Sequence, residues 1–283
     1  MPTMLVFGLG YLGEAVARRL RADGWSIRVT ARDPERRQML ASEGAPAIDP
    51  NDGAAMAAAV AESDAILVTA PPGAEGCPGL IALAPHLKGW RGRWIGYVSS
   101  TAVYGDRGGS WVDEGSALNA ATIPGARRVA AERGWLDLGA QEGLAIHVFR
   151  LPAIYGPGRS AVDRLREGTA RPVRKPGQVF NRIHVEDAAS GILASLARPR
   201  AGAIYNLTDD DPASAESVLE AAAARMGLPL PPETDLSDPS VSEAMRGFYL
   251  DSKRVSNARA KAELGWRPAF PTWREGLESL LAD

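Results

Sequence analysis

The chain has 283 residues, of which about 45% are hydrophobic, and a formal net charge of −2. This size suffices for one large domain or a core domain with a smaller lobe, and the balanced charge argues against a nucleic-acid-binding surface. The single cysteine, Cys77, excludes an intrachain disulfide framework, and with only three scattered histidines we expect no metal site.

The hydropathy pattern also argues against a membrane location. No apolar run is long enough to cross a bilayer. The N-terminal MPTMLVFGLG has no basic region before its short apolar stretch, which is typical of a buried strand rather than of a signal peptide. We therefore expect a cytoplasmic protein with neither a membrane nor a nucleic acid as partner.

Short apolar runs alternate with amphipathic segments through the first half of the chain. The pattern predicts strands at 4–7, 25–30, 45–48, 65–69, 94–99 and 144–149, with helices at 11–22, 33–44, 54–61, 79–87 and 126–139. This order predicts an α/β fold, a Rossmann-type doubly wound parallel sheet with helices on both faces.

The pattern changes after residue 151, where Pro and Gly become dense. It predicts strands at 179–184 and 203–207, helices at 185–197, 214–226, 252–264 and 272–281, and a loop at 228–239. We expect a Rossmann domain over 1–150 and a smaller C-terminal lobe over 151–283. Within the lobe, residues 178–210 are expected to return to the Rossmann core.

A GxGxxG pattern lies between the first strand and the first helix. Gly8 permits the tight turn, Gly10 lets the backbone approach a pyrophosphate, and Gly13 lets the helix pack closely on the sheet. The N–H groups at the helix start, where Tyr11 and Leu12 lie, would face the anion. A tight turn without a ligand is the alternative, but the strand and helix on either side favour dinucleotide binding.

Cofactor choice depends on the end of the second strand, which reads Val-Thr-Ala-Arg. An acidic residue there would accept the ribose 2′-hydroxyl of NAD, whereas an arginine accommodates the 2′-phosphate of NADP. From Thr30 to Arg32 there is no carboxylate, and Arg32 can pair with a phosphate. A solvated surface arginine is the alternative. We expect NADP as cofactor, in preference to NAD.

Motifs further along the chain carry a family resemblance. These are SSTAVYG from Ser99, VDE from Val112, Arg150 followed by YGPG from Tyr155, HVEDA from His184, and LGWRP from Leu264. Together they resemble the extended short-chain dehydrogenases/reductases, the NAD(P)-dependent epimerase/dehydratase family, in order across nearly the whole chain.

The resemblance implies a substrate bound between the Rossmann domain and the smaller lobe. It places Ser100 where the family's Ser or Thr hydrogen-bonds the reacting oxygen. It also implies that two further segments line the cofactor: the end of the fourth strand (Thr69, Ala70 and Pro71) and the end of the sixth, near the nicotinamide (Leu151, Pro152 and on to Ile154).

The sequence departs from the family at its acid–base pair. The family uses Tyr-x-x-x-Lys, followed four residues later by glutamate. Anchored on Glu132, this chain has Pro124 in the tyrosine position and Arg128 in the lysine position. Arg128 can keep a positive charge over the ribose but cannot act as a base, and proline offers no proton. The chain therefore resembles an atypical branch that carries GxGYLG and lacks the pair.

Other groups are weaker candidates for the missing acid. Tyr104, Tyr155 and Asp113 are possible substitutes, and a structural role is favoured for each. The markers of a nucleotide-sugar substrate are also missing, because Ala153 replaces an asparagine and Phe180 replaces an arginine; Arg182, two residues on, is a possible substitute. We expect a different substrate.

Two further features receive structural interpretations. His184 is expected to be a hydrogen-bonded structural histidine. The basic run at 171–175 is expected to be a solvated loop, with contact to an anionic substrate as the alternative.

Two functions remain open at this point. One is an NADP-dependent oxidoreductase or epimerase-like enzyme acting on an unidentified small carbonyl or hydroxyl compound. The alternative is a non-catalytic NADP(H)-binding sensor or scaffold. Pro124 favours the second, whereas SSTAVYG and the whole substrate lobe favour the first. The sequence does not determine the substrate, the reaction direction or the oligomeric state. A homodimer is one of the oligomeric states that it leaves open.

Overall fold

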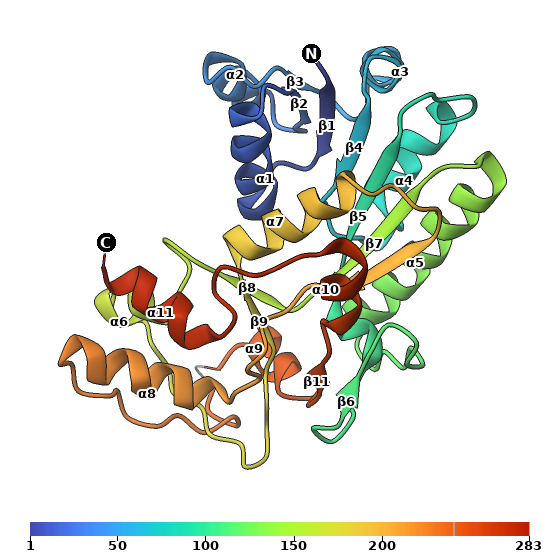
Figure 1. Ribbon diagram of the computed structural model, residues 1–283. Coiled ribbons are helices and arrows are strands. Elements are labelled where there is room, and N and C mark those ends of the chain that lie inside the picture. The colour runs from blue at the N-terminus through green and yellow to red at the C-terminus, as the bar shows by residue number, and fades with distance from the viewer. Residues whose placement is uncertain (240, 283) are drawn as a thin grey trace. The chain divides into compact units, whose positions relative to one another are not determined.

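The computed structural model describes residues 1–239 and 241–282, and the chain divides into two compact units (Figure 1). The first unit comprises Met1–Ser100, Ile123–Arg150 and Ala189–Tyr205; the second comprises Thr101–Thr122, Leu151–Ala188 and Asn206–Asp283.

This division differs from the expected one in two places. Thr101–Thr122 groups with the second unit, and the segment that returns to the first is Ala189–Tyr205 rather than 178–210. Strand pairing gives the reason. A two-residue strand within 101–122 pairs with a strand near the C-terminus, and 182–184 pairs with 153–155.

The first unit is built on a seven-stranded parallel sheet with strand order β10-β7-β5-β4-β1-β2-β3. The strands are β1 (Thr3–Phe7), β2 (Ser26–Thr30), β3 (Ala47–Ile48), β4 (Ala65–Val68), β5 (Trp94–Ser100), β7 (Ile146–Leu151) and β10 (Ala203–Asn206). The expected Rossmann sheet is confirmed. Its order reverses direction at β1, so the glycine turn after β1 lies at the switch point where such sheets bind ligands.

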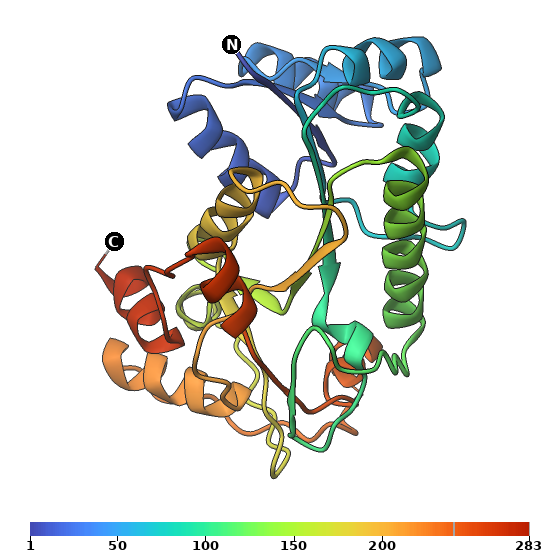
Figure 2. The same ribbon diagram turned by 45° about the vertical axis from the view of Figure 1, so that its right-hand side comes forward.

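Helices cover both faces of this sheet, as Figure 2 shows. They are α1 (Tyr11–Ala22), α2 (Pro34–Ser42), α3 (Gly53–Ala61), α4 (Pro78–Leu83) with the 3-10 turn η1 (Ala84–His86), and α5 (Ile123–Glu142); α7 (Val185–Leu196) begins in the second unit and ends in the first. The core between the sheet and α3, α4 and α5 includes Leu5, Ile66, Ile95 and Trp135, all fully buried.

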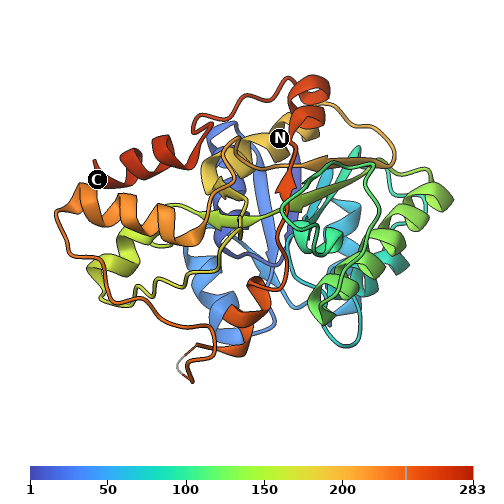
Figure 3. The ribbon, with the colours of Figure 1, turned by 90° about the horizontal axis from the view of Figure 1, so that it is seen from below.

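The second unit combines two small parallel sheets with a helical cluster. Its elements are η2 (Thr101–Tyr104), β6 (Trp111–Val112), β8 (Ala153–Tyr155), α6 (Ala161–Arg166), β9 (Arg182–His184), α8 (Ala215–Met226), α9 (Glu243–Phe248), β11 (Arg254–Val255), α10 (Ala258–Leu264) and α11 (Trp273–Leu281). β8 pairs with β9, and β6 with β11. Helices α6, α8 and α11 lie together (Figure 3) around a core that includes Val162, Leu219 and Leu277.

One predicted helix is wrong in its first half. Residues 252–264 were expected to be helical throughout, but β11 occupies 254–255 and α10 begins only at Ala258. The side-chain amide of Asn181 binds the Lys253 carbonyl (2.9 Å) and the Val255 N–H (2.8 Å), which holds this stretch extended. The expected loop at 228–239 contains neither helix nor strand.

Candidate functional site

The glycine turn follows β1 and is braced from both neighbouring strands. Gly8 has a φ of +89°, and a Cβ at this position would lie 3.0 Å from the Cβ of Ala70, so no other residue fits without strain. The Gly8 N–H donates to Oγ1 of Thr30 at 3.1 Å, and the hydroxyl of Thr69 donates to the Gly8 carbonyl. The structure thus brings together four residues expected at the cofactor.

The other two glycines have different roles. Gly10 is the exposed N-cap residue of α1, and no described residue apart from its two chain neighbours has an atom within 4 Å of the place that its Cβ would take. A Cβ on Gly13 would lie 3.3 Å from the Gly8 carbonyl oxygen, so this glycine allows close packing. The open space at Gly10 and the N–H groups of the first helical turn fit an approaching phosphate.

Tyr11 and Leu12 open α1. The Leu12 side chain is only 5% exposed and belongs to the core, while Tyr11 is half-buried. Any contact of Leu12 with a cofactor would therefore come from its backbone.

The end of β2 presents a cation. Arg32 is exposed, and its carbonyl accepts a hydrogen bond from the Arg37 guanidinium at 2.7 Å. The next carboxylate along the chain, Asp33, caps α2 by accepting from the Arg36 N–H at 2.9 Å. Asp33 is therefore engaged with its own helix. The Arg37 guanidinium at this strand end pairs with Asp49 at 3.2 Å, and Arg32 is the exposed cation beside it.

The end of β4 lies against the turn. The N–H groups of Thr69 and Ala70 both donate to the Phe7 carbonyl, at 3.0 and 3.3 Å, and Pro71 follows on the surface.

A buried charge network lies below the end of β5. Glu132 and Arg150 are 2% and 3% exposed, and their closest N–O distance is 2.8 Å. The Arg150 Nε also contacts both Glu132 oxygens at 3.2 Å, and the Ser99 hydroxyl donates to Glu132 at 2.5 Å. The network ties β5, α5 and β7 together just before Ser100, which is half-buried at the end of β5.

Comparison with known proteins agrees with these features. Residues 91–208 match the NAD dependent epimerase/dehydratase family model, and residues 3–78 match the model described as NADP oxidoreductase coenzyme F420-dependent. The chain is 41% identical to a functionally unknown conserved protein from Silicibacter pomeroyi, covering 100% of this chain and 99% of that one with a TM-score of 0.91.

Two further relatives are informative. A 3-diazoavenalumate denitrifying reductase from Streptomyces sp is 32% identical over 149 residues, which cover 49% of this chain and only 48% of that protein. The dTDP-glucose 4,6-dehydratase from Bacillus anthracis, in complex with NAD, has the same fold, with a TM-score of 0.82 at 18% identity over 100% of this chain and 96% of that one.

The chain belongs to the NAD(P)-dependent epimerase/dehydratase family.

The family's acid–base pair is absent from the start of α5. Pro124 lies exposed in the first helical turn, and one turn later Arg128 donates to the Val98 carbonyl. This bond fixes the Arg128 guanidinium at the end of β5. Tyr97 lies beside Arg128, but it is fully buried with its ring stacked on Trp135 at 6.2 Å, and burial raises its pKa against the opposing effect of Arg128.

The side chains considered as substitutes for the family's tyrosine have structural contacts within the second unit. The Tyr104 hydroxyl donates to Asn206 at 2.8 Å in the interior. The Tyr155 hydroxyl packs directly on the backbone of Gly276, where a Cβ would overlap it. Asp113 is exposed and accepts from the Gly115 N–H at 3.0 Å.

Arg182, considered as a diphosphate ligand in place of the family's arginine, is enclosed by backbone. Its guanidinium donates to the carbonyls of Phe180, Ala213 and Ser214 at 2.8 to 3.1 Å. Burial raises the pKa of the neighbouring Asp209 to about 8, although Arg182 opposes this shift.

The ring of His184 lies 4.2 Å from that of Phe270, and its Nδ1 accepts from the Glu186 N–H at 3.3 Å, in agreement with a structural histidine.

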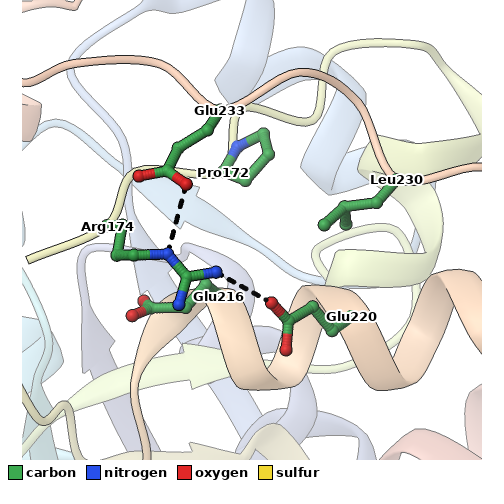
Figure 4. Close-up of a pocket in the computed structure, with 6 residues that line it drawn as sticks. All are labelled: Pro172, Arg174, Glu216, Glu220, Leu230 and Glu233. Atoms are coloured by element: carbon green, nitrogen blue, oxygen red, sulfur yellow. Dashed lines mark hydrogen bonds and ion pairs between the residues drawn. The ribbon is translucent and has the colours of Figure 1, made fainter.

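The basic run at 171–175 is tied to protein groups. Arg174 pairs with Glu220 of α8 (3.3 Å) and with Glu233 of the 228–239 loop (3.1 Å), as Figure 4 shows, and lines a shallow pocket with both. Lys175 donates to the Tyr249 carbonyl at 2.5 Å. These contacts give the run a structural role that its sequence did not reveal.

Among the residues that the structure describes, no group of three or more His, Cys, Asp or Glu side chains could hold a metal ion. In the same residues, no helix combines the length and apolarity needed to cross a membrane.

Proposed function

We propose that this chain is an NADP-dependent reductase that reduces a small organic acceptor by hydride transfer, without the tyrosine proton donor of its family. The observation that carries the proposal is the combination of a braced glycine turn, with Arg32 beside it, and a proline in the tyrosine position. When bound, NADPH would supply the hydride.

The first unit offers a fitting site for that cofactor. The turn from Gly8 to Gly13 would hold the pyrophosphate, because Gly10 leaves open space and α1 directs N–H groups toward it. Arg32 would pair with the 2′-phosphate. Arg128, fixed by the Val98 carbonyl, would place a positive charge over the ribose.

Other predicted contacts remain proposals. Thr69, Ala70 and Pro71 would line the cofactor from the end of β4, and Thr30 would hold the turn in shape. Ser100 would orient the reacting oxygen. Leu151 and Pro152, which lead from β7 into β8, would lie near the nicotinamide. Tyr104 would act through packing, because its hydroxyl is engaged by Asn206.

The substrate would lack a nucleoside diphosphate. Arg182 lies two residues after Phe180, the position of the family's arginine, and its guanidinium donates to three backbone carbonyls.

The Streptomyces relative is named as a reductase that denitrifies a diazo compound. Replacing a diazonium group by hydride releases N₂ and consumes no proton, which is chemistry that a site with Pro124 can support. The acceptor panel should therefore hold arenediazonium ions beside aldehydes and ketones.

Consumption of NADPH, followed by its absorbance, tests the proposal. We expect the purified protein to oxidise NADPH with at least one acceptor, above the rate without protein. Gly10→Val is the matched control, because a Cβ at this position lies in open space in the fold, whereas the valine side chain would block the pyrophosphate. Tight NADPH binding without turnover of any acceptor would contradict the proposal and favour a non-catalytic NADP(H) sensor or scaffold.

A further inference from the structure

A second arginine of the first unit lies next to the one expected at the cofactor. The side chain of Arg37, on α2, is 24% exposed, and its Nη1 contacts three groups. This nitrogen donates to the carbonyls of Ala31 and Arg32, at 2.9 and 2.7 Å, and lies 3.2 Å from Oδ2 of Asp49. One side chain therefore joins the start of α2 to the segments that directly follow β2 and β3.

The geometry of α2 explains how Arg37 reaches these groups. Asp33 is the N-cap residue, and its carbonyl accepts from the Arg37 N–H at 3.0 Å, so Arg37 lies in the first turn of the helix. Side chains of an α-helix are directed toward its N-terminus. The Arg37 side chain accordingly covers the segment before α2, which is the segment that carries Arg32.

This segment lies where the strand pairing of β2 ends. Thr30 is the last residue of β2, and the following Ala31 N–H donates to the Ile48 carbonyl of β3 at 3.0 Å. The carbonyls of Ala31 and Arg32 lie beyond this ladder and are bound by the Arg37 guanidinium instead. Arg37 thus continues the support of the backbone up to the residue that is expected to bind the cofactor.

Asp49 in turn holds Arg37. Its Oδ2 pairs with the guanidinium, and its Oδ1 accepts from the Asn51 N–H at 2.9 Å. The Asp49 side chain is 33% exposed, and ion pairs with this much exposure contribute little to stability. Supporting bonds of this kind are, however, what fixes the geometry of a binding group. The pair is therefore better suited to positioning than to stabilisation.

We propose that Arg37 is a positioning residue for recognition of the 2′-phosphate and thereby determines the preference for NADP over NAD; this rests on the proposed function. The Arg32 guanidinium would contact the phosphate, while Arg37 and Asp49 hold the backbone from which Arg32 projects. A long exposed side chain binds better from a fixed backbone, because it has fewer conformations to lose on binding.

Calorimetric titration of NADP⁺ and NAD⁺ into Arg37→Met tests the proposal without turnover. We expect the affinity for NADP⁺ to fall about tenfold, as is typical for the loss of a coupled neighbour. The affinity for NAD⁺, which has no 2′-phosphate, should change by less than about twofold. The preference for NADP⁺ should therefore fall with little change in the affinity for NAD⁺.

Arg36→Met is the matched control. Arg36 lies in the same helical turn and pairs with Glu14 of α1 at 3.1 Å, so its loss removes the same charge and also leaves a carboxylate without its arginine. The contacts found for the Arg36 guanidinium are with Glu14 and Met39, and not with the backbone that carries Arg32. This variant should keep the wild-type preference for NADP⁺.

A double variant separates positioning from a general effect of charge or stability. In the Arg32→Ala background, Arg37→Met should cause no further loss of preference, because the side chain that Arg37 positions is already absent. Independent contributions to phosphate binding would instead be additive. Calorimetric unfolding of each ligand-free variant shows whether it is folded, and Arg37→Gln, with a shorter uncharged side chain, should show the same fall in preference if Arg37→Met does not fold.

The possible failures are distinguishable. An unchanged preference in Arg37→Met, an equal loss in Arg36→Met, or additive losses in the double variant would each overturn Arg37 as a positioning residue and leave the proposed function standing. A wild type without any preference for NADP⁺ would overturn both.

Discussion

The buried pair of Glu132 and Arg150 gives a quantitative prediction for the first unit. Arg150 makes three contacts of 2.8 to 3.2 Å to the carboxylate, and both side chains are at most 3% exposed. Removing one partner leaves the other charge buried and unpaired, which costs about 3–5 kcal/mol. We therefore expect Glu132→Leu and Arg150→Met each to lower the free energy of unfolding by that amount.

The double variant isolates the interaction. Because it buries neither charge, it should be more stable than either single variant, although Ser99 loses its acceptor at a cost of about 1 kcal/mol. Urea unfolding followed by the fluorescence of Trp94 and Trp135, both buried in the same unit, measures the difference. Single variants within about 1 kcal/mol of the wild type, or a double variant with additive losses, would refute the reasoning.

Further predictions concern the turn and a buried histidine. Gly8→Ala should lower stability by about 1–3 kcal/mol, because its φ is +89° and its Cβ would lie 3.0 Å from Ala70. Gly10→Val should lose less, about 1 kcal/mol at most, because valine is a poorer N-cap residue than glycine, but it should bind NADPH at least about tenfold more weakly. Equal losses of stability in calorimetry would contradict this contrast. His147 accepts from the Arg200 N–H at 2.8 Å, and burial lowers its pKa to about 4. The stabilisation that depends on neutral His147 should be complete above the unfolded pKa of about 6.5 and decline as the pH falls toward 4. Between about pH 7 and about pH 4.5, the free energy of unfolding of the wild type should therefore fall by about 2–3 kcal/mol more than that of His147→Gln, as measured by urea titration. Parallel losses in the two proteins would be inconsistent with a buried neutral histidine.

Local signals were sufficient for most of the first unit. The Asp33-Pro34 pair predicts a helix start, and Asp33 indeed caps α2. Apolar runs predicted the strands, because a parallel sheet covered on both faces needs no alternation. The stretch before Ala258 was misassigned because its extended conformation depends on Asn181, more than 70 residues away, and no local pattern shows such a partner.

The candidate site likewise has features that local sequence predicts and features that depend on distant residues. The conformation of the glycine turn and the exposed position of Arg32 after β2 were predictable, because adjacent residues determine both. The bracing of Gly8 by the hydroxyls of Thr30 and Thr69 was not, since it joins three strands. Arg150 within the largely apolar IHVFRL strand was a usable signal, because a charge in a buried strand requires a partner.

Calorimetric titration of NADP⁺ and NAD⁺ into the wild type and Arg32→Ala tests the central claim most directly. A charge-assisted hydrogen bond to the 2′-phosphate contributes about 1.5–3 kcal/mol, so the wild type should prefer NADP⁺ by about 10- to 100-fold. Arg32→Ala should lose that preference while its affinity for NAD⁺ stays the same. A wild type that binds both equally, or neither, would contradict the account.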